Sequence, residues 1–359
     1  MTESQPVVLA ARIHGPGDVR VAAEPAAEPG PGEVLLRVTG VGLCGSDLHW
    51  WEEGSIGDAR LSRPLILGHE FGGVIVSGPR AGQRVAADPA YDCGECGPCR
   101  DGRTNLCLAM RFAGHGTTDG ALRSLMPWPE RLLVAIPDSI GDDEAPVLEP
   151  LGVALHAMDL AGVGVDPGPS GLAPAAGLRV GVYGCGPIGL LLVQLLRRAG
   201  AATVVATDLL AHRLAAADAM GASEAFLVDA GPDPESSSAR LAARERQVDV
   251  AFEVSGSDAA LDDAIAAVRP GGKVVLVGIP ARDRTSFEAA AARRKELALL
   301  LCRRMVPTDL PHAVAIAAQG GLQLTELISH RYDMARAPEA FEMLGTRVGL
   351  KIIVKPSTY

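Results

Sequence analysis

The stretch Arg179-Val-Gly-Val-Tyr-Gly-Cys-Gly-Pro-Ile-Gly189 is the most informative part of this chain. Its first five residues are an apolar run typical of a buried strand, and the glycines that follow match G-x-G-x-x-G before an amphipathic helix predicted over residues 188–198. In such a unit the first glycine makes a tight turn, the second lets the backbone approach a pyrophosphate, and the third lets the helix pack closely on the strand. The helix N-terminus faces the phosphates. The residues predicted to bind a dinucleotide here are Gly184, Gly186, Pro187, Ile188 and Gly189.

Strands and helices alternate along the chain beyond this stretch. We expect a helix over residues 212–220, closed by Gly221. Further strands are predicted over residues 202–207, 225–228, 248–254 and 273–277. Alternation of this kind predicts an α/β fold with a doubly wound parallel sheet covered by helices on both faces.

Asp208 follows the second predicted strand, 19 residues after Gly189. A carboxylate at this place accepts hydrogen bonds from the ribose hydroxyls of adenosine and repels a 2′-phosphate. It therefore favours NAD over NADP, with Arg213 as a further ribose or phosphate neighbour. A glycine-rich turn beside a surface aspartate is the alternative, and the strand, helix and acidic residue together argue against it.

The two ends of the chain have a different texture. Short strands broken by Gly and Pro are expected in the first 150 residues, for example over 33–38 and 84–88. Residues 162–177 are rich in Gly and Pro and are expected to form a loop. The last 60 residues leave the alternating pattern and end in a strand-like run over 350–355, so we expect them to return to the first domain.

Length and charge narrow the class of protein. The chain has 359 residues, enough for two domains, and 33 Lys and Arg against 43 Asp and Glu give a net charge of −10. This acidic balance disfavours nucleic acid and anionic membranes as partners. No apolar run reaches the roughly 18 residues that span a bilayer, and residues 1–12 do not form a signal peptide. We expect a cytoplasmic protein that acts on a small molecule.

Four of the seven cysteines lie in one short stretch with the spacing C-x2-C-x2-C-x7-C. Four thiolates this close can complete a tetrahedral zinc shell with no open position, which predicts a structural site. The alternative, four free thiols, would place nucleophilic side chains in an exposed loop. The predicted zinc ligands are Cys93, Cys96, Cys99 and Cys107.

Other possible metal ligands are spread along the first half of the chain. Cys44 lies in the segment GLCGSDLHWW over residues 42–51, His69 lies in LGHEFGG over 67–73, and Glu149 lies in LEPL over 148–151. Taken singly, a cysteine is more often a small buried side chain and a histidine is more often hydrogen-bonded in the core. The residues alone do not link the three segments.

Together these motifs resemble the zinc-dependent medium-chain alcohol dehydrogenases, and within them the polyol (sorbitol-type) and idonate-type branch. The resemblance covers residues 34–354 and is most specific at GLCGSDLHWWEEGSIG (42–57), GHEFGG (68–73), the four-cysteine stretch and Glu149-Pro-Leu. The Met110-Arg-Phe112 and Phe252-Glu-Val-Ser-Gly256 stretches are similar to the idonate-type members. The resemblance implies a GroES-like catalytic domain over residues 1–152 and 299–359, with a structural-zinc lobe over 92–108, and a Rossmann domain over 153–298.

The resemblance also implies roles for individual residues. Cys44 and His69 bind the catalytic zinc, with Glu149 or Glu70 as a third protein ligand, and Ser46 and His49 form a proton relay. Trp50 is implied to lie beside the substrate, and either Arg304 or Arg303 is implied to face it. Met305 stands where the family has an aromatic residue, and this departure leaves the substrate open. Further residues implied to bind the cofactor are Ser255, Val277, Gly278 and Ile279.

The reaction that the resemblance implies is hydride transfer between NAD and a secondary alcohol. An open zinc site lowers the pKa of a bound alcohol, and the hydride then passes to the nicotinamide. Two zinc ions per chain and a homodimer or homotetramer are expected. Two other hypotheses stay open. One is a dehydrogenase of the same mechanism that acts on L-threonine or an aminocyclitol. The other is a nucleotide-binding relative without dehydrogenase chemistry.

Overall fold

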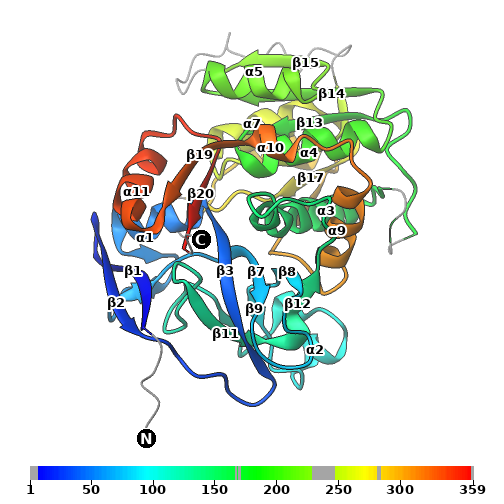
Figure 1. The fold of residues 1–359 in the computed structure, drawn as a ribbon. Helices are drawn as coiled ribbons and strands as arrows, with labels where there is room; N and C mark the ends of the chain where they lie inside the picture. The colour runs from blue at the N-terminus through cyan, green and yellow to red at the C-terminus, as the bar shows by residue number, and fades with distance from the viewer. Residues whose placement is uncertain (1–6, 166–167, 169–170, 229–246, 281–283, 357–359) are drawn as a thin grey trace, which may run out of the picture. The chain divides into compact units, whose positions relative to one another are not determined.

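The computed structural model describes residues 7–165, 168, 171–228, 247–280 and 284–356. The chain forms two compact units, of which unit 1 comprises Met1–Glu149 and Val306–Tyr359, and unit 2 comprises Pro150–Met305. Figure 1 shows the order of their elements. Among the described residues, no helix combines the length and the apolar character that crossing a membrane requires.

Unit 2 contains a parallel sheet of six strands in the order β15-β14-β13-β16-β17-β18. From β13 the chain builds in one direction through α4, β14, α5 and β15, and in the other through β16, α7, β17, α8 and β18. Right-handed crossovers place α4 and α5 on one face of the sheet and α7 on the opposite face. The strands are β13 (Arg179–Tyr183), β14 (Thr203–Asp208), β15 (Glu224–Leu227), β16 (Val248–Glu253), β17 (Val268–Leu276) and β18 (Ala298–Leu301). The helices are α3 (Leu148–Ala161), which begins in unit 1, α4 (Pro187–Arg198), α5 (Ala211–Ala219), α7 (Asp258–Ala267) and α8 (Ala289–Arg294).

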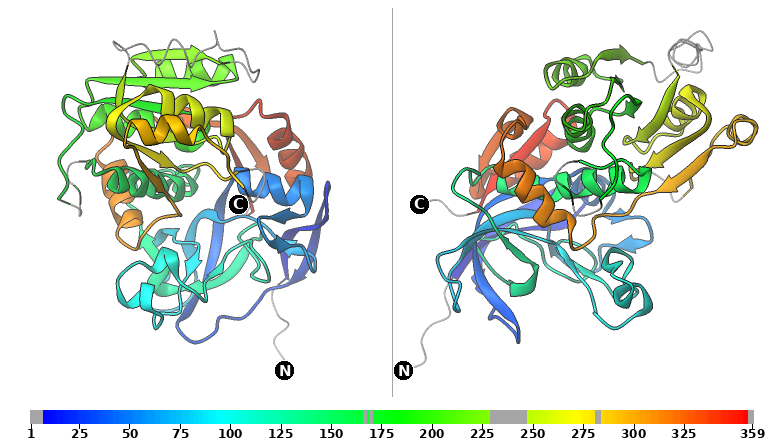
Figure 2. Two further views of the ribbon diagram at one scale, coloured as in Figure 1. Left: turned by 180° about the vertical axis from the view of Figure 1, so that it is seen from behind. Right: turned by 90° about the vertical axis from the view of Figure 1, so that its right-hand side faces the viewer.

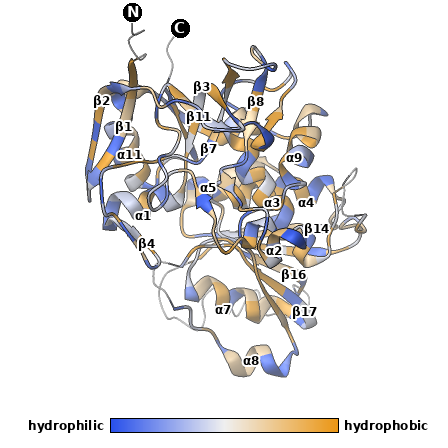
Figure 3. Cartoon of the chain, turned by 90° about the horizontal axis from the view of Figure 1, so that it is seen from below, coloured by the Kyte–Doolittle hydropathy of each residue, from blue (hydrophilic) through white to orange (hydrophobic). Residues whose placement is uncertain are grey.

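The core of unit 2 explains why these segments form a doubly wound sheet. Strands buried on both faces need side chains that are apolar throughout, and β16 and β17 are coloured mostly as hydrophobic in Figure 3. One face of the sheet packs Tyr183, Val205 and Ala251 against Leu261 and Ile265 of α7. The α/β fold class predicted from the sequence is confirmed, and each predicted strand and helix of this unit is present within two residues of its expected bounds, except that β17 begins at Val268.

Unit 1 is rich in β-structure. Its main sheet has seven strands in the order β12-β8-β7-β3-β20-β19, with β11 also paired to β3. Figure 2 gives two further views of these strands. A second sheet has the order β2-β1-β6. The strands of the main sheet are β3 (Glu33–Leu43), β7 (Glu70–Ile75), β8 (Arg84–Ala87), β11 (Leu125–Pro129), β12 (Leu133–Ala135), β19 (Ile328–Asp333) and β20 (Lys351–Lys355). Those of the second sheet are β1 (Val7–Gly15), β2 (Asp18–Pro25) and β6 (Leu65–Ile66).

Short elements complete unit 1. The small strand pairs are β4 (Ser55–Ile56) with β5 (Ala59–Arg60), and β9 (Ala90–Tyr91) with β10 (Arg111–Phe112). The helices are α1 (Gly45–Glu53), α2 (Gly97–Arg100), α9 (Asp309–Ala318), α10 (Leu324–Leu327) and α11 (Ala337–Thr346). One apolar core joins both sheets with Trp50 of α1 and Phe341 of α11. The C-terminal strand β20 pairs with β3, so the end of the chain completes the sheet that the first residues begin.

The division of the chain differs in detail from the boundaries predicted at residues 152 and 298. Residues 299–305 were expected in the catalytic domain, but β18 pairs in parallel with β17, with Leu301 opposite Leu276. The apolar run Ala298–Leu301 extends the parallel sheet because it pairs with an equally apolar neighbour. Unit 2 consequently ends at Met305 and includes Arg303 and Arg304.

Candidate active site

Three side chains from two segments of unit 1 come together at one end of the main sheet. The ligand atoms of Cys44, His69 and Glu70 lie within 4.8 Å of one another. Strand register explains this: β3 and β7 are antiparallel with Gly42 opposite Glu70, so Cys44, just past the end of β3, meets His69, just before β7. A side chain on Gly42 would collide with the Glu70 carboxylate, so only glycine allows this close approach.

Asp47, which the sequence analysis did not single out, orders this cluster. It is 1% exposed, and its Oδ2 accepts a 2.9 Å hydrogen bond from the backbone N–H of Cys44 at the start of α1. Its Oδ1 lies 3.6 Å from Nδ1 of His69, and Nε2 of the same ring lies 3.4 Å from Oγ of Ser46. Metal-binding histidines usually donate one ring N–H to a carboxylate. The acidic side chain in the first turn of α1 could have been recognised from the sequence as a cap, but its contact with His69 depends on the fold.

Lys351 of β20 forms a buried ion pair with Glu70. Its Nζ lies 2.6 and 2.8 Å from the two carboxylate oxygens and donates a 3.1 Å hydrogen bond to the carbonyl of Leu43. Both side chains of the pair are 1% exposed. Lys351 was not predicted from the sequence, because a lysine in an apolar strand near the C-terminus gives no sign of a carboxylate 281 positions away.

Glu149 is buried near this cluster but is not one of the three residues whose ligand atoms meet. Burial raises the pKa of Glu149 to about 7; the charge of His69 opposes this shift, and those of Glu70 and Asp88 add to it. Burial alone would lower the pKa of His69, but the nearby charge of Asp47 raises it well above its usual value. Negative groups contribute to both shifts, and such groups favour a bound cation.

The donor set fits zinc. A thiolate, an imidazole and a carboxylate are the three side-chain types that bind Zn²⁺ in proteins, and three protein ligands leave one position open for a further ligand. Cys44, His69 and Glu70 supply one of each.

Aromatic rings lie beside the cluster. Phe112 of β10 is tilted against His69 with 5.2 Å between ring centroids, and Trp50 meets His115 edge to face at 5.5 Å. Trp50 is 2% exposed and belongs to the apolar core of unit 1. Its position beside a substrate stays a prediction, and His115 was not identified from the sequence.

The other residues predicted to act in catalysis lie in both units. Ser46 and His49 share a face of α1, and Nδ1 of His49 lies 3.5 Å from a carboxylate oxygen of Glu53. Arg304 lies in unit 2, just after β18, with a φ of 58° that side chains rarely adopt. Met305 beside it is buried.

The four-cysteine lobe is assembled as its spacing predicts. The sulfur atoms of Cys93, Cys96, Cys99 and Cys107 all lie within 4.8 Å of one another. The Sγ atoms of Cys96 and Cys99 are 3.3 Å apart, and the backbone N–H of Cys93 donates to Sγ of Cys107 at 3.3 Å. Backbone N–H groups of Leu108 and Cys99 lower the pKa of Cys96 to about 6, whereas burial and the hydrogen bond with Cys96 raise the pKa of Cys99 to about 12. This donor set fits a closed, structural zinc site.

The predicted nucleotide-binding residues lie at the carboxyl edge of the sheet in unit 2. Gly184 has a φ of 107°, and Gly186 is the N-cap of α4. Asp208 accepts 2.7 and 2.8 Å hydrogen bonds from the backbone N–H groups of Cys185 and Leu210. A side chain on Gly186 would lie 3.9 Å from the guanidinium of Arg213, which places that arginine beside the turn. Dinucleotides bind at this edge of doubly wound sheets, at the switch point where the connections after two neighbouring strands lead to opposite faces of the sheet.

A second turn at the same edge contains the remaining predicted cofactor residues. Glu253, which was not singled out from the sequence, accepts 2.7 Å hydrogen bonds from both the N–H and the hydroxyl of Ser255. Its own carbonyl accepts from the N–H groups of Val277 and Gly278. Glu253 therefore ties the turn after β16 to the turn after β17, where Ile279 is half exposed.

Comparison with known proteins agrees with this arrangement. Residues 30–138 match the alcohol dehydrogenase GroES-like domain, and residues 187–319 match the zinc-binding dehydrogenase domain. Sorbitol dehydrogenase of Macaca fascicularis is 34% identical over 98% of this chain and 97% of its own. The structure of L-idonate 5-dehydrogenase from Escherichia coli superimposes with a TM-score of 0.87 at 28% identity, covering 98% of this chain and 99% of that one. A structure from Sinorhizobium meliloti 1021, described as a zinc-binding dehydrogenase bound to NADP, has a TM-score of 0.83 at 28% identity and covers 98% and 100%.

The chain therefore belongs to the zinc-binding medium-chain alcohol dehydrogenase family. It is an oxidoreductase that acts on CH–OH groups, as the resemblance of its motifs implied.

Proposed function

We propose that this protein transfers a hydride between NAD and a secondary alcohol of a polyol or sugar acid, such as sorbitol, iditol, xylitol or idonate. The observation that carries the proposal is the meeting of Cys44, His69 and Glu70 at one buried point. The names of the relatives support the substrate class, since they are dehydrogenases of sorbitol and of L-idonate.

The catalytic zinc is bound by Cys44 and His69, with Glu149 as the third protein ligand. Glu70 lies closer to the other two ligands, but both of its oxygens accept hydrogen bonds from Lys351. A carboxylate already neutralised by an ammonium is a weaker metal donor than one whose pKa is raised to about 7 by burial and negative neighbours. Glu70 would thus contribute mainly negative charge near the metal, and Lys351 holds the Glu70 carboxylate in place.

When bound, the zinc ion supplies Lewis-acid polarisation of the substrate hydroxyl. Bound NAD would accept the hydride from the carbinol carbon, and the proton of the hydroxyl oxygen would pass to solvent. Ser46 Oγ takes part in that proton transfer and His49, on the same face of α1, carries the proton onward, with Glu53 3.5 Å from its Nδ1. Asp47 holds the ring of His69 in place throughout.

The cofactor is NAD. Asp208 is held by two backbone N–H groups at the end of β14, where its negative charge would repel a 2′-phosphate. Because a relative's structure contains NADP, the preference depends on this residue and not on the fold.

Trp50 and Arg304 contribute to substrate selection. The backbone of Arg304 is held in a left-handed conformation, and such strain at a non-glycine residue often marks a functional position. Arg303, its neighbour, is the alternative, and a carboxylate-bearing substrate would distinguish the two. Arg304→Lys and Arg303→Lys should differ in KM for idonate, with the larger rise in the variant whose arginine faces the substrate.

A substrate panel tests the proposal. Sorbitol, xylitol, idonate and L-threonine are compared at equal concentration with NAD and with NADP, and NAD(P)H absorbance is followed. We expect turnover of a polyol or sugar acid with NAD. Preferential turnover of L-threonine would favour the amino-substrate reading, and no turnover of any alcohol by protein containing zinc would contradict the proposal.

The third ligand is tested by metal content. Glu149→Gln should lose about one of two zinc ions per chain, whereas Glu70→Gln should retain both and lose only part of the activity. The reverse pattern would assign the ligand to Glu70.

A further inference from the structure

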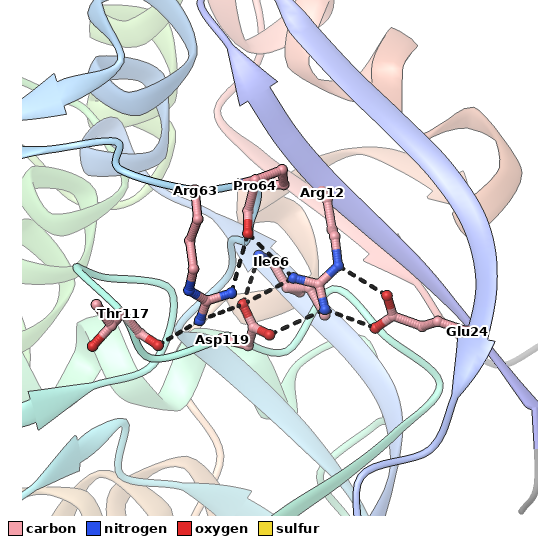
Figure 4. A network of polar contacts seen from close by, with 7 residues as sticks. All are labelled: Arg12, Glu24, Arg63, Pro64, Ile66, Thr117 and Asp119. Atoms are coloured by element: carbon pink, nitrogen blue, oxygen red, sulfur yellow. Dashed lines mark hydrogen bonds and ion pairs between the residues drawn. The ribbon is translucent and has the colours of Figure 1, made fainter.

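Figure 4 shows a network of charged side chains in unit 1, none of which belongs to the proposed metal or cofactor sites. Arg12 of β1 lies between two carboxylates, Glu24 of β2 and Asp119. Arg63 joins from the other side, with a guanidinium nitrogen 3.5 Å from Asp119 and a 2.6 Å hydrogen bond to the carbonyl of Thr117. The network thus links four separate segments.

Asp119 is its central member. Its two oxygens each accept a 3.1 Å hydrogen bond from Arg12, and Oδ1 also accepts a 3.2 Å bond from the backbone N–H of Ile66. Ile66 ends β6, three residues before His69. Asp119 therefore holds the strand that leads directly into the proposed metal ligand.

The backbone beyond Asp119 continues this attachment. The N–H groups of Gly120, Ala121 and Leu122 donate to the carbonyls of Ile66, Gly68 and Leu67 at 2.7 to 3.0 Å. A side chain on Gly120 would collide with the backbone of Leu67 and Gly68, so the two segments are in contact along their length.

The segment on the other side of Asp119 carries the aromatic rings of the site. It starts at β10, where Arg111 lies 3.9 Å above the ring of Tyr91 and Phe112 contacts His69. It continues through His115, which contacts Trp50, to Thr117. This segment, residues 111–120, is thus held at one end by β9 and at the other by Asp119.

We propose that Asp119, through Arg12 and Arg63, is a positioning residue that fixes segment 111–120 and thereby holds Phe112 against His69 of the candidate metal site and His115 against Trp50. The inference rests on the proposed function for its catalytic consequence. Since catalysis is sensitive to displacements of about 1 Å, releasing this segment misplaces the polyol and lowers its turnover. Cofactor binding, which depends on residues of unit 2, is unaffected.

Glu24 offers a matched control. Like Asp119, it forms two hydrogen bonds with Arg12, at 2.8 and 3.0 Å, and the two carboxylate side chains are similarly exposed, at 25% and 20%. Its hydrogen bonds go to Arg12 and not to segment 111–120 or the strand before His69. Glu24→Gln removes the charge of a comparable ion pair, as Asp119→Asn does at the other carboxylate, without releasing the segment.

The experiment compares wild type, Asp119→Ala and Glu24→Gln as full-length, zinc-loaded protein. In Asp119→Ala we expect amide hydrogen exchange to become faster in residues 111–122, and kcat/KM for the polyol to fall by about 10- to 100-fold, while KM for NAD stays unchanged. Glu24→Gln should match wild type in all three measurements. Asp119→Asn, which keeps an acceptor for the N–H of Ile66, should lie between them and serves if the alanine variant does not fold.

The outcomes separate the two proposals. Unchanged exchange in Asp119→Ala, or faster exchange with unchanged kcat/KM for the polyol, would overturn the positioning role. Equal losses in Asp119→Ala and Glu24→Gln would also overturn it, because general destabilisation would then explain both. Failure of wild-type protein to oxidise any polyol would instead contradict the proposed function, and the exchange measurement would still decide whether Asp119 fixes the segment.

Discussion

The two cysteine-containing sites of unit 1 are built in different ways. The four-cysteine lobe takes all its ligands from 15 consecutive residues, Cys93 to Cys107, whereas the Cys44 site draws on the end of β3, the start of β7 and, in our proposal, the start of α3. The lobe has one kind of ligand and no open position. The Cys44 site mixes sulfur, nitrogen and oxygen and has further charged groups behind it. A site formed within a short loop can stabilise that loop, while a site assembled from distant strands depends on the whole domain being folded first.

The largest effect on activity should come from removing a ligand of the Cys44 site. His69→Ala should lose about one of two zinc ions per chain and lower kcat/KM by roughly 1,000-fold or more, because Lewis-acid stabilisation is worth several kcal/mol and each 1.36 kcal/mol is a factor of ten. Metal analysis together with steady-state kinetics checks this. His330→Ala, at a half-buried histidine of β19, is the control and should retain both ions and full activity. If His69→Ala also lost the zinc ion of the lobe, the two sites would not bind metal independently.

Removing a ligand of the lobe should affect stability more than chemistry. Cys96→Ser should lose the other zinc ion and at least about 2 kcal/mol of unfolding free energy, lowering Tm by roughly 4–8 °C, since structural zinc contributes directly to folding. Calorimetry and metal content measure this, with Cys302→Ser of unit 2 as the control. A fall in kcat comparable to that of His69→Ala, in protein still folded, would contradict a purely structural role.

The Cys44 site should depend on the carboxylate of Asp47. Asp47→Asn should lower zinc affinity or activity by about 10- to 100-fold, because the carboxylate that orients the His69 ring is lost. Asp92 next to the lobe is the comparison: it is also buried, but it pairs with Arg131 at 2.7 Å, and Asp92→Asn should leave the affinity of the lobe for zinc nearly unchanged. Equal effects in the two variants would show that both sites need such support.

The smallest expected effect is a difference in the rate at which a chelator removes the two zinc ions from the unmutated protein. Dialysis against a chelator should remove the zinc of the Cys44 site before that of the lobe, because three protein ligands leave one position of the Cys44 site open, whereas four thiolates enclose the other ion. Activity should therefore disappear while Tm has fallen only partly. Parallel loss of both ions over time would count against this order.

Much of the fold followed from local patterns. The run RVGVYGCGPIG identified the nucleotide-binding unit because strand, turn and helix signals are consecutive, and the alternation after it predicted the parallel sheet. The boundary at residue 298 missed β18, since a short apolar run does not say which sheet it joins. The aromatic rings beside His69 and the network around Asp119 carried no signal of their own.

By itself the sequence determined the four-cysteine site, the glycine turn and, through motif resemblance, the family, because each depends on residues close together in the chain. Only the tertiary structure brought Asp47 to His69, Lys351 to Glu70 and Asp119 to Ile66. The physical reason is strand register. Leu43 of β3 pairs with Ile352 of β20, and this pairing brings the Lys351 ammonium to the Leu43 carbonyl, 308 positions away in the chain. No short stretch of sequence contains that information.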